Sequence, residues 1–233
     1  TYIFDPSGYA YSGLASDRVG EVSATILTAP SADGPWTPWD AAAFGQTSPQ
    51  QTLGDGTYGW DVPKGYYKVR YSKDGYRTVD SEVVRILPER MDLNVNMLAT
   101  AAPTVTGIAL GDDSNAITLG FDRWMPLAQV SDHVSVRDAR GRTVAGGITA
   151  SDGGTALDGA RLAKSFVFTP DKTLSAGQTF TVTVGGAAQD YAAVQIGADI
   201  SQSVTTPNKG GGGPLGGLLG LLQWLLCKLL HLC

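Results

Sequence analysis

Very few side chains in this sequence could carry out chemistry. The 233 residues include two histidines, His133 and His231, and two cysteines, Cys227 and Cys233. Cys227 and His231 are four residues apart, so on a helix they share one face and could bind a metal ion together with other copies of the chain. We favour simple packing at a polar seam for this pair, and a solvated turn for His133. With no catalytic dyad, Walker loop, nucleophile elbow or zinc spacing in the sequence, we predict a protein that is not an enzyme and has no cofactor or metal ion.

Aspartates at two predicted turns are the other candidate ligands. Asp112 and Asp113 are adjacent, and Asp152 and Asp158 lie among glycines and a serine. Carboxylates in such loops can bind Ca²⁺. The alternative, which we favour, is that all four are solvated turn residues.

The C-terminal segment 215–233 differs from everything before it, because ten leucines are concentrated there. Placed 100° apart as on a helix, the leucines fall on one arc, and the small and polar residues, together with Trp224, fall on the other. Burying ten leucines at roughly 1.5–3 kcal/mol each gives a gross upper bound near 15–30 kcal/mol. We therefore predict an amphipathic helix that docks or anchors the chain. Its predicted assembly residues are Leu215, Leu218, Leu219, Leu221, Leu222, Trp224, Leu225, Leu226, Leu229, Leu230 and Leu232.

Three environments could bury this helix: other copies of the chain, a bilayer, or the chain's own domains. Its length of roughly 28 Å permits a membrane span, but Gln223, Lys228 and His231 lie inside the segment and no basic cluster follows it. Gly216 and Gly220, spaced for close backbone approach, suit a helix bundle. We favour self-assembly into a homo-oligomer and keep a membrane anchor as the main alternative.

The two cysteines of the tail are candidates for an interchain disulfide. Cys227 and Cys233 are roughly 9 Å apart along a helix and on different faces, so they cannot bond to each other there. If oxidised, they would bridge neighbouring chains. The glycines of segment 209–214 predict a flexible hinge before the helix.

Charge and composition limit the function further. The net charge is −5, with 8 basic and 12 acidic residues in 1–99, and 7 and 10 in 100–208, so neither part offers a basic patch for nucleic acid. The part before the tail has no cysteine and is rich in threonine, glycine and alanine, which fits an extracellular or cell-surface protein. The sequence starts at Thr1 without methionine, which fits either a removed signal peptide or a trimmed segment.

Alternating apolar and polar residues predict strands throughout residues 1–99. The alternation is clear in 21–27, 66–71, 81–87 and 91–97, and turn residues such as Asp55-Gly56 and Asp74-Gly75 separate these runs. We expect an antiparallel β-sandwich.

This first region resembles the carboxypeptidase-regulatory-like, transthyretin-like domains of bacterial surface proteins. The resemblance is carried by residues 5–11, 19–27, 55–69 and 73–76. It implies a seven-stranded sandwich that serves as a spacer or binding module without catalysis. Related repeats form an internal cross-link between a lysine near the first strand and Asn or Asp in the last. Here Asn94 and Asn96 are available but no lysine precedes Lys64, so we expect no such bond.

A long loop, residues 30–52, interrupts the first region. It carries Trp36, Trp39, Phe44 and Gln46. Aromatic residues on a loop can mark a site for a sugar or a partner. The alternative, which we favour, is that the loop folds back and its aromatics plug one open end of the sandwich.

Residues 100–208 again alternate, in 104–110, 116–121, 134–137 and 179–184. This region resembles the bacterial Ig-like domains of surface-layer and adhesin proteins, through residues 119–125, 168–184 and 189–193. The last of these segments lacks the Gly-Asn pair of the family pattern, which leaves the conformation after Asp190 open. The resemblance implies a structural module that ends in a strand near 203–206.

Taken together, these patterns predict a mainly β protein of two tandem antiparallel sandwiches, 1–99 and 100–208, followed by the hinge 209–214 and the helix 215–233. We expect an extracellular structural protein, a subunit of a surface filament or homo-oligomer whose C-terminal helices form its hydrophobic core. A membrane-attached adhesin or stalk module is the alternative.

Overall fold

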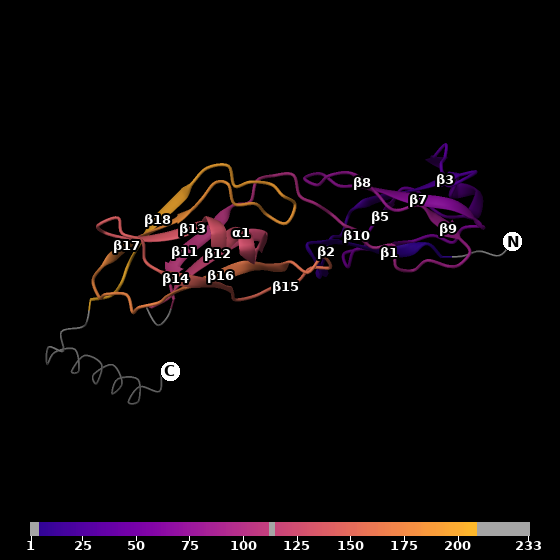
Figure 1. The fold of residues 1–233 in the computed structure, drawn as a ribbon. Coiled ribbons are helices and arrows are strands. Elements are labelled where there is room, and N and C mark those ends of the chain that lie inside the picture. The colour runs from indigo at the N-terminus through magenta and orange to yellow at the C-terminus, as the bar shows by residue number, and fades with distance from the viewer. Residues whose placement is uncertain (1–4, 112–114, 209–233) are drawn as a thin grey trace, which may run out of the picture.

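The computed structural model describes residues 5–111 and 115–208. Within them the chain forms two β-sandwiches that lie end to end (Figure 1), each with its own buried apolar core. The predictions for the hinge, the C-terminal helix, His231, both cysteines and the Asp112–Asp113 pair lie outside the described residues.

The first sandwich consists of two sheets. The four-stranded sheet has the order β10-β1-β2, with β6 pairing with β1, and the six-stranded sheet has the order β4-β3-β7-β8, with β5 on β3 and β9 on β7. The strands are β1 (Ser7–Ser12), β2 (Leu14–Arg18), β3 (Ser23–Ala29), β4 (Thr37–Pro38), β5 (Gln50–Gln51), β6 (Thr57–Gly59), β7 (Gly65–Ser72), β8 (Val79–Asp80), β9 (Val84–Ile86) and β10 (Val95–Asn96). A short 3-10 helix, η1 (Ala42–Phe44), lies in the long loop.

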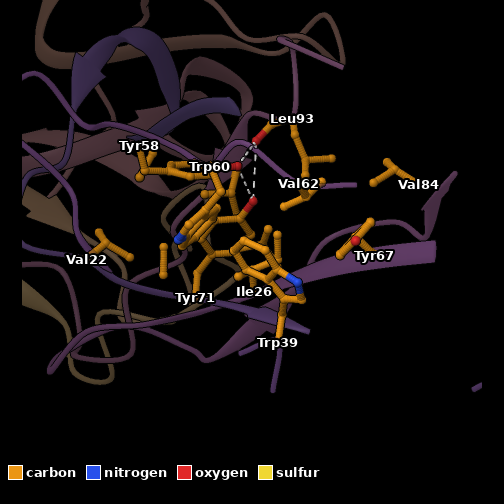
Figure 2. Close-up of a cluster of buried hydrophobic side chains, with 14 of the residues drawn as sticks. Val22, Ile26, Trp39, Tyr58, Trp60, Val62, Tyr67, Tyr71, Val84 and Leu93 are labelled. Atoms are coloured by element: carbon orange, nitrogen blue, oxygen red, sulfur yellow. Dashed lines mark hydrogen bonds between the residues drawn. The ribbon is translucent and has the colours of Figure 1, made fainter. Parts of the chain in front are cut away.

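The alternation seen in the sequence decides which side chains enter this core. In β7, Tyr67, Val69 and Tyr71 are buried, while the residues between them face outward. Figure 2 shows the hydroxyls of Tyr58 and Tyr71 meeting near the carbonyl of Leu93, so buried polar atoms are paired within the core. Burial raises the pKa of both tyrosines well above the usual range.

Two details of the predicted first sandwich are wrong. The strand expected over 91–97 is reduced to Val95–Asn96, and β10 pairs with β1 in parallel. Leu93, Val95 and Met97 are buried as the alternation predicts. Side chains replace part of the strand ladder, because the Asn94 amide oxygen accepts a hydrogen bond from the backbone N–H of Tyr9 and the Leu93 carbonyl accepts one from the Tyr58 hydroxyl.

The second sandwich pairs a five-stranded sheet with a three-stranded sheet. The larger has the order β11-β12-β16-β14, with β15 on β16, and the smaller has the order β13-β17-β18. The strands are β11 (Val105–Leu110), β12 (Ile117–Pro126), β13 (Val134–Asp138), β14 (Gly146–Ala150), β15 (Gly154–Thr155), β16 (Arg161–Pro170), β17 (Thr179–Val184) and β18 (Ile200–Thr205). All of their pairings are antiparallel.

A helix that the sequence patterns do not predict connects the two sheets of this sandwich. The α1 helix, Leu127–His133, follows Pro126 and buries Val130. His133 therefore lies at a helix end and not in a solvated turn, and its Nδ1 is 2.9 Å from the Gln129 carbonyl oxygen. Among the described residues, no helix is long and apolar enough to span a membrane.

Candidate functional site

The residues that could have carried out chemistry have structural roles in the described part of the chain. Asp152 accepts hydrogen bonds from the backbone N–H groups of Lys164 and Ser165, and Asp158 accepts one from Ala160. In residues 5–111 and 115–208 no group of three acidic, histidine or cysteine side chains is placed to hold a metal ion. The structure therefore brings no ligand set together around the two turn aspartates.

The aromatic residues of the long loop separate into two groups. Trp39 is 8 % exposed, belongs to the first core and stacks on Phe44 with ring centroids 5.0 Å apart. The Gln46 amide exchanges two hydrogen bonds with the backbone of Asp61, which fixes the loop against the sandwich. Trp36 is directed elsewhere, to the outer face of the six-stranded sheet, where the Lys68 ammonium lies 5.1 Å from its ring centroid. The predicted plug therefore holds for Trp39 alone, since Phe44 is exposed and Trp36 lies outside the core.

The candidate cross-linking residues are also accounted for. The Asn96 amide oxygen accepts a hydrogen bond from Gly13 at 2.9 Å, as the Asn94 oxygen does from Tyr9. Both amides therefore hold the first strand in place, which is a positioning role.

The most elaborate arrangement of side chains lies where the two sandwiches meet, and we call this contact the joint. Its apolar part is a separate cluster of three buried residues, Leu14 from the first sandwich and Ala156 and Leu162 from the second, with Trp124 and Tyr191 packed against them. Leu14 stands at the start of β2, directly after Gly13, and is 6 % exposed. The joint thus buries apolar surface that neither sandwich core covers.

Polar contacts surround the apolar part of the joint. The Trp124 indole N–H donates a short hydrogen bond to the Asp17 carboxylate, and the Lys164 ammonium lies 3.4 Å from the same carboxylate and 4.6 Å from the Trp124 ring centroid. The Arg77 guanidinium donates to the carbonyl of Ala192 at 2.7 Å. The three contacts Trp124–Asp17, Lys164–Asp17 and Arg77–Ala192 join residues more than a hundred positions apart, so they fix the relative orientation of the two sandwiches.

Backbone geometry fits the joint closely. Gly13 has a φ of +70°, and a Cβ at this position would come within 2.8 Å of the Trp124 ring. Two separate constraints therefore require glycine at position 13: the left-handed backbone conformation, and the Trp124 indole packed against this residue.

The turn after Asp190 presents two residues to the joint. The buried Asp190 carboxylate accepts hydrogen bonds from the N–H groups of Ala192 and Val194, each at 2.9 Å. Ala193 takes a φ of +60°, the left-handed conformation that the missing glycine of the family pattern would have supplied. The two hydrogen bonds offset that backbone strain, and they place Tyr191 and Ala192 against the first sandwich.

The connecting segment is held as well. The Arg123 guanidinium donates to the Ala101 carbonyl at 2.7 Å, and the Asp122 carboxylate accepts from the Thr104 N–H at 2.9 Å. The linker between the sandwiches is thus bound to β12, the strand that also carries Trp124.

Burial at the joint perturbs its tyrosines. Desolvation, together with a hydrogen bond to Asp158, raises the pKa of Tyr191 to about 12. Desolvation also raises the pKa of Tyr11, with smaller contributions from Tyr9 and Asp158. Both hydroxyls therefore stay neutral at physiological pH.

Local patterns in the sequence do not predict the joint. Leu14, Asp17 and Trp124 belong to no recognisable sequence motif, and their contacts depend on how the two sandwiches are oriented. The tryptophan at position 124, in the segment 119–125 that carries the Ig-like resemblance, was the signal available in the sequence, because a large amphipathic side chain at a strand end requires a partner surface.

Comparison with known proteins identifies the second sandwich. Residues 98–206 match the family model of the bacterial Ig-like domain, which confirms the predicted resemblance of that region. An S-layer protein of Geobacillus stearothermophilus is 34% identical over 109 residues, a stretch that is 46% of this chain and 8% of that protein. The chain therefore spans a small part of the length of this relative.

Two solved structures align over most of the chain. The shaft pilin spaA of Lactobacillus rhamnosus GG, in a mutant form, is 12% identical, with 90% of this chain and 95% of that chain covered and a TM-score of 0.31. The BSP domain of a biofilm associated protein is 14% identical, with 90% and 30% covered and a TM-score of 0.24. The family match begins at residue 98, so the resemblance of the first sandwich to carboxypeptidase-regulatory-like domains stays a prediction.

Proposed function

We propose that this chain is a structural, non-catalytic segment of an extracellular, cell-surface protein, in which two sandwiches act as one stiff unit. The observation that carries the proposal is the joint. Leu14, Asp17 and Arg77 on one side contact Trp124, Tyr191 and Ala192 on the other through apolar packing and directional hydrogen bonds. Flexible neighbouring domains would not need such contacts.

The Ig-like match of residues 98–206 and the similarity to an S-layer protein support the cell-surface setting. The aspartates of the described turns bind backbone amides and the loop tryptophan Trp39 fills the core, so neither forms a reactive centre. A spacer or scaffold is the role that such a pair of sandwiches fulfils directly.

The finer part of the proposal concerns assembly. We propose that the chain is a subunit of a surface filament or homo-oligomer whose helices, residues 215–233, pack their leucines together, with Cys227 and Cys233 able to bridge neighbouring chains. The sequence of the tail supports this proposal, since ten leucines on one arc need a partner surface. The domain limits 1–99 and 100–208 belong to the same proposal.

Deletion of residues 210–233 tests the assembly. We expect a monomer in sedimentation velocity, with both sandwiches folded, whereas the full chain forms large lipid-free particles or filaments in water. A truncated protein that remains a large assembly would show that the tail is not the assembly element. Stoichiometric phospholipid in washed full-length material would favour the membrane anchor.

A further inference from the structure

We propose that the outer face of the six-stranded sheet in the first sandwich binds an acidic polysaccharide, through a row formed by Trp36, Tyr66 and Arg85. This inference goes beyond the structural role proposed above and does not depend on the C-terminal helix. The starting observation is that Trp39 is buried in the core of the sandwich, whereas Trp36, on the same loop, is not part of that core.

The register of the strands defines the row. Tyr66 is the direct partner of Ala29 on one side and of Arg85 on the other. Trp36 immediately precedes Thr37, which pairs with Thr28, so the tryptophan comes next to Ala29 across the sheet. Directly paired residues project from the same face, and neighbouring strands are about 4.8 Å apart. The row therefore extends over about 14 Å.

The side chains of the row face outward. Tyr67 and Val84 are buried in the core, so their neighbours Tyr66 and Arg85 project to the opposite face of the sheet. Ala29, the residue between the two aromatic positions in the register, has only a methyl side chain. The Lys68 ammonium packs against the Trp36 ring, which orients the indole on this face.

The charged residues of β7, β8 and β9 on this face carry a charge opposite to that of the whole chain. Lys68 and Arg70 both pair with Asp80, at 2.8 and 2.7 Å, so this triad keeps a net charge of one positive unit. Arg85 is exposed and has no ion pair or side-chain hydrogen bond within residues 5–111 and 115–208. The charged side chains that strands β7, β8 and β9 place on this face, namely Lys68, Arg70, Asp80 and Arg85, therefore sum to two positive units, in a protein with a net charge of −5.

The combination of groups selects the ligand class. A guanidinium binds a carboxylate through two parallel hydrogen bonds. Aromatic rings offer flat apolar surface with a polar edge, against which the C–H faces of sugar rings can pack. A polysaccharide of uronic acids presents both features repeatedly along an extended chain. An acidic peptide would match the charge but leave the two aromatic positions without a flat partner.

Titration calorimetry of the full chain with oligogalacturonate tests the proposal, with a neutral galactan of similar length as the comparison ligand. We expect binding of oligogalacturonate that weakens as salt is added, and no binding of the galactan. Arg85→Ala and Tyr66→Ala should each weaken binding by about tenfold or more, because each removes a direct contact to the ligand. Arg140→Ala, which alters an exposed arginine of the second sandwich, is the matched control and should bind like the wild type.

Circular dichroism of each variant separates loss of binding from loss of fold, and Arg85→Glu provides a second surface change that reverses the charge without altering the core. Three outcomes would overturn the proposal: no binding by the wild type, equal binding by the wild type and the Arg85 and Tyr66 variants, or tighter binding of oligoglutamate than of oligogalacturonate. The last outcome would assign the face to an acidic peptide.

Discussion

Replacing Leu14 with alanine should loosen the joint while both sandwiches stay folded. Leu14 is 6 % exposed and packs with Ala156 and Leu162, outside the main core of either sandwich. The change removes three carbon atoms from the apolar cluster, which at about 0.8 kcal/mol each corresponds to about 2.4 kcal/mol of contact free energy between the sandwiches. A residual cavity would add to this loss.

Differential scanning calorimetry of the protein lacking residues 210–233 would measure the effect. Contact across the joint stabilises whichever sandwich unfolds first, because the second one unfolds after its partner surface has gone. A loss of about 2.4 kcal/mol should therefore lower the first transition by roughly 10 °C or more and leave the second unchanged.

Leu53→Ala is the matched control, since Leu53 is 66 % exposed in the same sandwich, and it should shift neither transition by more than a degree or two. If Leu14→Ala lowered both transitions equally, Leu14 would belong to a common core and the joint would not be a separate contact. If it lowered neither, the joint would contribute no stability and the stiff unit would have to be abandoned.

Four further results are expected. In a double-mutant cycle of Asp17→Asn and Trp124→Phe, we expect a coupling free energy of about 1 kcal/mol in urea unfolding, because the indole N–H donates to the carboxylate; strict additivity would exclude a direct bond. Gly153→Ala should destabilise the second sandwich by about 2 kcal/mol or more, because Gly153 has a φ of +81° and a Cβ there would lie 2.0 Å from the Leu162 carbonyl oxygen. Gly159 has a φ of +88° but open space around it, so Gly159→Ala should lower the free energy of unfolding by only about 1 kcal/mol, through backbone strain alone. Hydrogen bonds from Arg70 lower the pKa of Asp80 from 3.8 to about 2. The contribution of the Asp80 carboxylate to stability is therefore complete above pH 4 and disappears as the pH falls towards 2. The difference in unfolding free energy between wild type and Asp80→Asn, measured by urea unfolding, should shrink over that range. The double variant Leu222→Asp, Leu226→Asp should abolish assembly in sedimentation, because each buried charge costs several kcal/mol. Gln223→Asp should have much less effect. Equal effects of the two variants would show that the tail is buried on all sides or is not helical.

Much of the architecture follows from local patterns in the sequence. The alternation in 66–71 and 179–184 predicts the strands Gly65–Ser72 and Thr179–Val184, because an extended chain places successive side chains on opposite faces. The turn glycines Gly56 and Gly75 take positive φ, as their position after aspartate indicates. The mainly β class and the Ig-like character of the second region could therefore be predicted.

Other elements depend on contacts between distant residues. The α1 helix is seven residues long and has a single fully buried residue, Val130, so it carries almost no periodic signal. The predicted strand over 91–97 is mostly absent as a ladder, because Asn94 and the Leu93 carbonyl bond to Tyr9 and Tyr58 in other strands. Such substitutions of side-chain bonds for a strand ladder cannot be derived from a local pattern.

The sequence by itself determined that this protein has two β-rich regions with little catalytic material, and that ten leucines at its C-terminal end require cover. Only the tertiary structure decided that Leu14 and Asp17 meet Trp124, and that Trp39 enters the core while Trp36, three residues away, faces outward. The reason is physical: alternation along a strand fixes which face a side chain occupies, whereas the partner it meets depends on strand order and on the orientation of one sandwich against the other.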